Sequence, residues 1–131
     1  MKIFGIGTDI VNIKRIKKIL KNNGARFKNK IFSESEINYC EKKRDPGPFY
    51  AKRFAAKEAF SKALGTGIRK GVNFKDIEVS NNPQGKPSIF LKGDLAAYLK
   101  KKVKYKKYDI HLSLSDDKPW AQATAIITYN K

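Results

Sequence analysis

Cysteine and histidine each occur only once among the 131 residues of this sequence. Cys40 therefore has no partner for an internal disulfide bond, and a zinc cluster of cysteine and histidine ligands is excluded. Cysteine usage of this kind is typical of a reducing compartment, so we expect a cytoplasmic protein. No apolar run approaches the roughly 20 residues of a membrane-spanning helix, and Asp9 and Asn12 interrupt the first apolar stretch too early for a secretory signal. The sequence predicts no membrane span.

Acidic residues are also scarce, with 12 Asp and Glu against 29 Lys and Arg. The formal net charge is +17 and the isoelectric point is about 10.0. A chain this basic repels itself when it is compact, which favours an anionic partner: nucleic acid, an acidic protein, a phosphorylated small molecule or a membrane surface. A genome that favours lysine, asparagine and isoleucine codons is the alternative explanation of the excess.

The length and the even composition predict one domain over residues 1–131, since the sequence has no repeat, no Ser/Gly linker and no shift in composition. Periodicity and turn signals predict helices over residues 12–22, 33–43, 49–64 and 94–103 and strands over residues 2–8, 76–80, 87–91, 109–114 and 121–129. Ser33 and Glu36 form a capping-box pattern at the second helix, and Gly24 is a candidate stop for the first. We therefore predict an α+β fold, with helices packed on a small antiparallel sheet.

Two tracts carry most of the positive charge. Residues 14–30 hold eight cations and no acid, which indicates either a docking face for an acidic surface or a solvated helix face. Residues 100–107 hold six lysines, with Tyr105 and Tyr108 alongside, as in RNA-binding segments. Because no nucleic-acid-binding motif accompanies this second tract, we interpret it as a solvated helix end and loop.

Two acids stand in places where an acid is unusual. Asp9 ends an apolar strand, where it serves either as the cap of the following helix or as a functional carboxylate. Glu58 lies among alanines and phenylalanines, and a carboxylate in a packed helix needs a cation or a metal. Lys62, one turn further on, supplies a simple ion pair as the alternative. The glycines of Gly65-Thr66-Gly67 expose backbone N–H groups that suit phosphate, although this signal is weak alone.

These residues fall in four segments that follow one another along nearly the whole chain. They are Gly5-Ile6-Gly7-Thr8-Asp9-Ile10-Val11 with Arg15 beyond it; Arg53-Phe54-Ala55-Ala56-Lys57-Glu58-Ala59 through Lys62 and Gly65-Thr66-Gly67; residues 74–79 with Gly85-Lys86-Pro87; and His111-Leu112-Ser113-Leu114-Ser115. In order and spacing they resemble the motifs of holo-acyl-carrier-protein synthases, the small 4′-phosphopantetheinyl transferases. One departure is Asp116, which stands where many members carry a second histidine.

The resemblance implies a Mg²⁺-dependent enzyme that moves the 4′-phosphopantetheine arm of coenzyme A onto a serine of acyl carrier protein and releases adenosine 3′,5′-bisphosphate. It implies the compact 4′-phosphopantetheinyl transferase fold, assembled as a homotrimer with active sites at the subunit interfaces. Coenzyme A and acyl carrier proteins are both anionic, which agrees with the net charge of +17.

The resemblance also implies roles for individual residues. Asp9 and Glu58 are expected to bind Mg²⁺, and Lys62 to contact the phosphates; the proton acceptor for the serine stays open among Lys62, Glu58 and metal-bound water. The residues expected to bind coenzyme A are Arg53, Lys57, Lys62, Thr66, Gly67, Lys86, Pro87 and His111. The residues expected to dock the carrier protein are Lys14, Arg15, Lys18 and Lys21.

Two other functions fit the charge alone. A basic nucleic-acid-binding module would need no Glu58, and a catalytically silent scaffold would dock acidic carriers without turnover. The intact set of Asp9, Glu58 and Lys62 favours the transferase, for which no nucleic-acid partner is expected.

Overall fold

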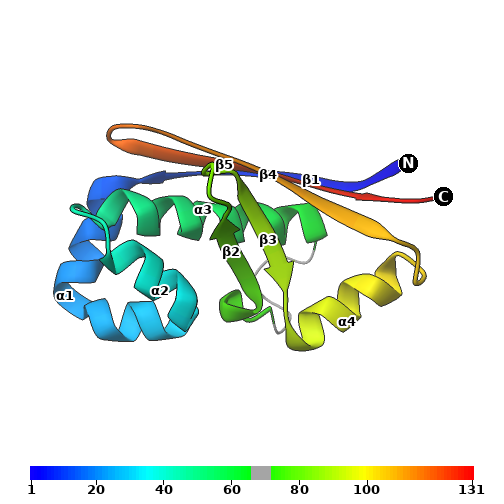
Figure 1. Cartoon of the computed structure of the whole chain (residues 1–131), viewed down its shortest axis with the longest axis horizontal. Coiled ribbons are helices and arrows are strands. Elements are labelled where there is room, and N and C mark those ends of the chain that lie inside the picture. The colour runs from blue at the N-terminus through cyan, green and yellow to red at the C-terminus, as the bar shows by residue number, and fades with distance from the viewer. Residues whose placement is uncertain (66–71) are drawn as a thin grey trace.

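A computed structural model describes residues 1–65 and 72–131 of the chain, and it contains a three-stranded antiparallel sheet and a separate hairpin (Figure 1). The elements in chain order are β1 (Lys2–Asn12), α1 (Ile13–Ile31), α2 (Glu34–Glu41), α3 (Gly47–Leu64), a 3₁₀ turn (Phe74–Asp76), β2 (Ile77–Asn81), β3 (Pro87–Leu91), α4 (Gly93–Lys102), β4 (Tyr108–Asp117) and β5 (Trp120–Tyr129). The sheet has the order β1-β5-β4, and β2 pairs with β3. The predicted α+β class is confirmed.

The long helix α3 lies along one face of the three-stranded sheet, with α1 and α2 at one end of the molecule and α4 at the other (Figure 1). Alternate residues of β5 face α3 and are fully buried, namely Ala121, Ala123, Ala125 and Ile127. The facing side of α3 also carries small residues: Ala55, Ala56 and Ala59 are fully buried. Small side chains on both partners let helix and sheet pack closely, and this contact forms the centre of the core.

The opposite face of the same sheet, here called the bare face, carries exposed apolar side chains beside polar ones such as Thr8 and Ser113. Ile6 and Ile10 of β1 are 61% and 62% exposed, and Trp120 at the start of β5 is 47% exposed. In the described part of the chain no helix covers this face (Figure 1). A row of large apolar side chains in water is typical of a surface that another protein covers.

The first helix begins where it was predicted to begin, but it ends nine residues later than predicted, at Ile31 instead of residue 22. The strand β1 continues to Asn12, whose side chain accepts a hydrogen bond from the Lys14 amide and caps α1. Asp9 therefore lies inside the strand and is not the cap. Gly24 does not end the helix either: α1 kinks at Asn23 (φ −142°, ψ 39°) and runs on to Ile31, because this second part packs apolar residues on the core.

The capping box predicted at Ser33 is confirmed and is joined to a buried ion pair. The Ser33 amide donates to Glu36 Oε1 at 2.8 Å, and the Glu36 amide donates to Ser33 Oγ at 3.3 Å. The same Glu36 carboxylate accepts from Lys57 Nζ at 2.7 Å and from the Val79 amide at 2.9 Å. One carboxylate thus ties α2, α3 and β2 together.

Candidate active site

The first strand approaches α3 more closely than any residue other than glycine would permit. A β-carbon on Gly5 would lie 1.8 Å from the carbonyl oxygen of Ala63, and one on Gly7 would lie 2.0 Å from that of Ala59. Asp9 follows on the same face of β1, because successive alternate residues of a strand point the same way. The glycines therefore bring Asp9 against the turn of α3 that carries Lys62.

Lys62 joins the strand and the helix through its ammonium group. Its Nζ donates to the Thr8 carbonyl oxygen at 2.9 Å and to Asp9 Oδ1 at 3.2 Å. The Asp9 side chain is 16% exposed and that of Lys62 is 55% exposed, so the pair lies at the rim of the protein, open to a ligand. Among the described residues Lys62 forms its ion pair with Asp9 and not with Glu58, the partner that the spacing of four residues along the helix had suggested.

Glu58 forms a cluster with Asp9 and Lys62, and the negative charge of Asp9 acts on its carboxyl group. Partial burial, and next the nearby Asp9 carboxylate, raise the pKa of Glu58 above its usual range, while Lys62 and Arg15 act in the opposite direction. Two acids, one lysine and one arginine from β1, α1 and α3 thus share one electrostatic environment. The structure brings together the three residues that were predicted to be catalytic.

The donor set of this cluster suits a hard divalent cation. Magnesium prefers oxygen ligands, and proteins hold it with one or two carboxylates while substrate phosphates and water supply the rest. Asp9 and Glu58 provide two such carboxylates, and their mutual repulsion is what a cation would relieve. In the described ranges no group of three or more acidic, histidine or cysteine side chains is placed to hold a metal, so a complete protein cage is absent there.

A basic recess, separate from this cluster, lies between α3 and the β2–β3 hairpin. It has a volume of about 230 Å³, and Arg53 and Pro87 line it together with Tyr39 and Asn81. The Arg53 guanidinium lies 4.0 Å from the centre of the Tyr39 ring and donates from Nη2 to Asn81 Oδ1 at 2.7 Å. Its Nε is buried and has no partner in the described structure. Lys86 lies in the adjoining turn, where its amide donates to Asn82 Oδ1 at 2.9 Å.

Lys57 is placed differently from the prediction. Its side chain is fully buried, and Nζ donates to Glu36 Oε1 and to the carbonyl oxygens of Phe74 and Ile77, at 2.7–2.8 Å. Burial lowers the pKa of Lys57, and Glu36 opposes that effect. This ammonium group presents no surface to a ligand, so the geometry assigns it to the interior of the fold and speaks against a contact with coenzyme A.

His111 lies on the other face of the sheet from Asp9. It pairs across the strands with Ile126, which in turn pairs with the exposed Ile6, whereas Asp9 pairs with the buried Ala123. His111 Nε2 is 3.0 Å from Thr128 Oγ1. Within one chain the sheet therefore separates His111 from the Asp9–Glu58–Lys62 cluster.

Asp116, at the position of the family's second histidine, forms an ion pair with Lys52 at 3.1 Å. This pair links the end of β4 to α3 beside the Arg53 recess, which Lys52 also lines. A carboxylate is here engaged by a lysine of the same chain, an arrangement that a histidine in this place would not reproduce at neutral pH.

Comparison with known proteins decides the family. The sequence model of the 4′-phosphopantetheinyl transferase superfamily matches residues 5–123 of this chain. The chain belongs to this superfamily. The resemblance inferred from the four motifs is thereby confirmed, and the chain is similar over its length to proteins named holo-[acyl-carrier-protein] synthase.

The relatives of this superfamily member cover it almost completely. The holo-[acyl-carrier-protein] synthase of Pelagibacter ubique is 48% identical over 127 residues, which are 97% of this chain and 98% of that protein. The synthase of Brucella ovis is 46% identical over 126 residues, with coverages of 95% and 94%. The crystal structure of the Neisseria meningitidis synthase has a TM-score of 0.86 at 38% identity, covering 96% of this chain and 98% of that one. The Helicobacter pylori synthase, solved in complex with coenzyme A, has a TM-score of 0.81 at 36% identity, with coverages of 94% and 99%.

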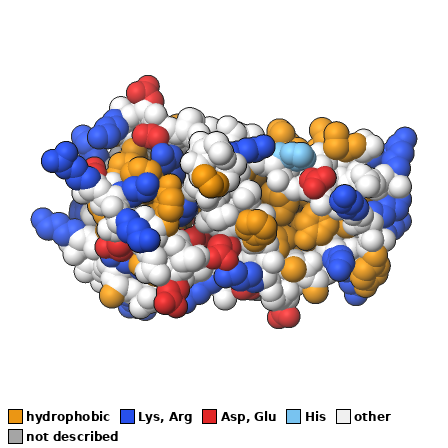
Figure 2. Space-filling view, viewed as in Figure 1, with side chains coloured by type: hydrophobic (Ala, Val, Ile, Leu, Met, Phe, Trp, Pro, Cys, Tyr) orange, Lys and Arg blue, Asp and Glu red, His pale blue; other side chains and the backbone are white. Residues whose placement is uncertain are grey.

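The basic first helix of this superfamily member begins beside the cluster. The predicted docking residues Lys14, Arg15, Lys18 and Lys21 are all exposed. Lys and Arg side chains gather over this end of the molecule in Figure 2. Two lysines of the basic tract over residues 14–30 form ion pairs with acids elsewhere in the chain: Lys17 with Asp45 at 2.8 Å and Lys28 with Glu41 at 3.0 Å. The tract is therefore less self-repelling than its sequence indicates.

Two predicted residues and two overlooked ones complete the account of the site. Thr66 and Gly67 lie outside the described residues. Tyr39 and Asn81 were not predicted, although both hold Arg53. No local signal marks Tyr39, which looks like any aromatic residue on a helix, and Asn81 looks like the start of a turn.

In the described ranges no helix is both long and apolar enough to cross a bilayer.

Proposed function

We propose that this protein transfers the 4′-phosphopantetheine group of coenzyme A to a serine of an acidic acyl carrier protein. The observation that carries the proposal is the convergence of Asp9, Glu58 and Lys62 at one open edge between β1 and α3. The near-complete match to proteins named holo-[acyl-carrier-protein] synthase, one of them solved with coenzyme A, supports it.

The reaction is a phosphoryl transfer with a defined balance of bonds. The serine oxygen bonds to the phosphorus that carries the pantetheine arm, and the bond from that phosphorus to the bridging oxygen of the pyrophosphate breaks. Adenosine 3′,5′-bisphosphate leaves with the bridging oxygen, and the serine hydroxyl gives up its proton. Such a reaction depends on positioning and on neutralising charge on the phosphates.

Each residue of the cluster has a role that follows from its contacts. Lys62 is exposed at the rim and already donates hydrogen bonds, so it is suited to contact a phosphate oxygen. Glu58, whose pKa is raised by burial and by the Asp9 charge when no cation is bound, is suited to share a cation with Asp9.

Magnesium fits the carboxylates of this cluster. Asp9 and Glu58 would hold it, and when bound it supplies positive charge to the pyrophosphate and to the leaving group. Recognition of the adenosine part is assigned to the Arg53 recess, where a guanidinium group with a buried, unpartnered Nε lies beside Pro87. The carrier protein would dock on Lys14, Arg15, Lys18 and Lys21, since Arg15 connects that face to Glu58.

The complete site requires more than one chain. The bare face with Ile6 and Ile10 is continuous with the His111 side of the sheet, and burial of that face between copies would cover it. A homotrimer that uses this face would also allow His111 of one protomer to reach the Asp9–Glu58–Lys62 cluster of a neighbour. A site at the interface removes the separation that the sheet imposes within one protomer.

A mass measurement tests the transfer. The purified protein is incubated with apo-acyl carrier protein, coenzyme A and Mg²⁺, and the carrier is weighed before and after. We expect a gain equal to one phosphopantetheine group, lost in Glu58→Ala and Asp9→Asn and retained in Lys75→Ala, which removes an exposed lysine outside the site. An unchanged carrier mass with the wild-type protein at every metal and pH tried would overturn the proposal.

Mixing two inactive variants tests the interface. Glu58→Gln and His111→Ala are prepared separately, dissociated, and reassembled together. If the site is shared between protomers, some mixed assemblies contain one intact site, and activity returns. If both residues act within one chain, the mixture stays as inactive as its components.

A further inference from the structure

A second strongly basic pocket lies where the two chain ends meet, remote from the Asp9–Glu58–Lys62 cluster. It has a volume of about 310 Å³. Asp9 is seven residues beyond Lys2 on β1, a separation of about 23 Å at about 3.3 Å per residue. Figure 2 shows Lys and Arg side chains at this end of the molecule as well as at the α1 end. The proposed transfer reaction gives this pocket no role.

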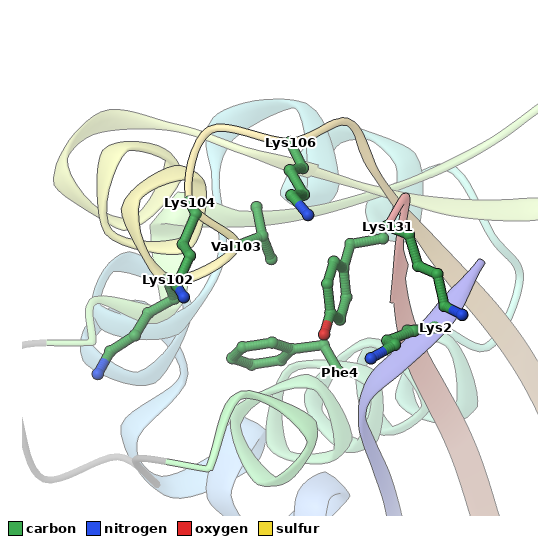
Figure 3. A pocket seen from close by; sticks show the side chains of 8 residues that line it. Lys2, Phe4, Lys102, Val103, Lys104, Lys106 and Lys131 are labelled. Atoms are coloured by element: carbon green, nitrogen blue, oxygen red, sulfur yellow. The ribbon is translucent and has the colours of Figure 1, made fainter.

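Five lysines line the pocket, and no acidic side chain does: Lys2, Lys102, Lys104, Lys106 and Lys131. Figure 3 shows Lys104 and Lys106 on the segment that follows α4, and Lys2 and Lys131 on the opposite side of the pocket. In the described part of the chain none of the five forms an ion pair with a carboxylate, in contrast to Lys17, Lys28 and Lys52. The pocket therefore concentrates positive charge that the protein itself does not neutralise.

The floor of the pocket is apolar and aromatic. Phe4 of β1 and Tyr129 of β5 line it, with ring centres 6.4 Å apart in an edge-to-face arrangement, and Val103 closes it from the α4 side. A floor of this kind accepts a flat or aliphatic group, while the ammonium groups at the rim accept an anion. Both are features of a recess for an organic phosphate and not of a uniformly solvated lysine tract.

The backbone holds one of these lysines, Lys104, and its neighbour Tyr105 in an unfavourable conformation. Lys104 and Tyr105 both have positive φ, at 56° and 61°. The Tyr105 amide donates to the Lys100 carbonyl at 2.8 Å and the Lys104 amide to the Lys101 carbonyl at 3.0 Å, which is the Schellman motif that ends many helices. Lys104 occupies the position at which glycine is strongly preferred. Lys104, which lines the pocket, therefore has a backbone conformation that costs a lysine more than it would cost glycine.

We propose that this pocket is a binding site for a soluble phosphate-bearing anion, held by Lys2, Lys104 and Lys106 over Phe4 and Tyr129. The site is separate from the catalytic cluster and does not depend on the proposed transfer reaction. Several closely spaced ammonium groups favour a ligand with two or more negative charges, such as a pyrophosphate or a bisphosphate, over a single carboxylate.

Inorganic pyrophosphate is the probe, and the amide resonances of the ¹⁵N-labelled protein are the readout. We expect saturable shifts at residues 103–106 and at Phe4, in the absence of Mg²⁺ and at constant ionic strength. Shifts at residues of α3 near Glu58 report the catalytic cluster separately, so the two sites are distinguished in one titration. Absence of saturable shifts at residues 103–106 would overturn the proposal, whatever happens at Glu58.

A matched pair of double variants tests which lysines matter. Lys104→Gly with Lys106→Ala removes two charges from the pocket, and we expect the dissociation constant at residues 103–106 to rise about tenfold or more. Lys100→Ala with Lys101→Ala removes two exposed charges of the same segment outside the pocket, and we expect less than a twofold change. Equal weakening in both would show a diffuse charge effect and contradict a defined site.

The glycine substitution also guards against a folding artefact. Because glycine suits the left-handed position, Lys104→Gly is expected to keep or raise the melting temperature while it weakens pyrophosphate binding. Vesicles of phosphatidylglycerol form the second arm: if they shift residues 103–106 and soluble pyrophosphate does not, the ligand is a membrane surface and the proposal fails.

Discussion

The carbonyl oxygen of Ala59 lies 2.0 Å from the place where a β-carbon of Gly7 would be. Helix α3 and strand β1 therefore touch through backbone, two residues before Asp9. This contact sets how far the Asp9 carboxylate stands from Glu58 and Lys62.

Gly7→Ala should destabilise the protein and separate β1 from α3. The added methyl group has no free space, because it meets the Ala59 carbonyl and the Lys62 β-carbon, and we expect a loss of about 3 kcal/mol in unfolding free energy with near-complete loss of transfer activity. Gly24→Ala is the matched control. Its β-carbon meets nothing within 4 Å, so this helical substitution should stabilise by about 0.5–1 kcal/mol. Denaturant unfolding and the carrier mass assay measure both effects; equal stability of the two variants would contradict the tight contact.

Glu58→Gln should raise the thermal stability of the metal-free protein at neutral pH while abolishing transfer. The pKa of Glu58 is higher in the folded chain than its usual value of 4.5, so the folded state binds this proton more tightly than the unfolded state. The ionised carboxylate therefore opposes folding at neutral pH, and this penalty disappears as the pH falls through the raised pKa. The gain of the variant should shrink towards zero near and below pH 4.5. A melting-temperature series from pH 4 to pH 8 checks the trend, and a gain that grows on acidification would refute it.

Lys57→Met should damage the fold rather than the binding of coenzyme A. Removal of the ammonium group leaves the buried Glu36 carboxylate without its cation, which costs about 3–5 kcal/mol. We expect the Michaelis constant for coenzyme A to stay within about twofold at a temperature where the variant is folded. Lys62→Met supplies the contrast, since this exposed side chain should be dispensable for stability and needed for turnover. If the folded Lys57→Met variant showed a large rise in the Michaelis constant for coenzyme A, Lys57 would have to contact coenzyme A after all.

Ile6→Lys together with Ile10→Lys should dissociate the assembly. Charges on the bare sheet face cannot be buried between copies without a large desolvation cost. Phe90→Lys alters an equally exposed side chain, 59% accessible, on the β2–β3 hairpin and should leave the mass in solution unchanged. Sedimentation equilibrium measures the masses. A wild-type protein that is already monomeric would rule out the proposed trimer.

The sequence alone was informative wherever a local rule applies. The capping box at Ser33, the hairpin around residues 81–87 and the alternation along residues 110–115 all depend on near neighbours, and each is present in the structure. The predicted end of α1 was wrong, and the reason is physical. Gly24 resembles a helix stop, but packing of the following apolar turn against the core outweighs the weak local preference.

The sequence itself determined the family, since its four motifs occur in order along the chain, and those motifs also predicted Asp9, Glu58 and Lys62 as the reacting groups. Tertiary structure decided which cations are available: Lys57 and Lys62 belong to the same helix, yet one is sealed against Glu36 and the other reaches Asp9 at the rim. It also decided that His111 faces away from Asp9, and that scattered lysines from both chain ends share a pocket. The reason is physical, because burial, ion pairing and the side of a sheet depend on residues far apart in the chain, and no local pattern records those distances.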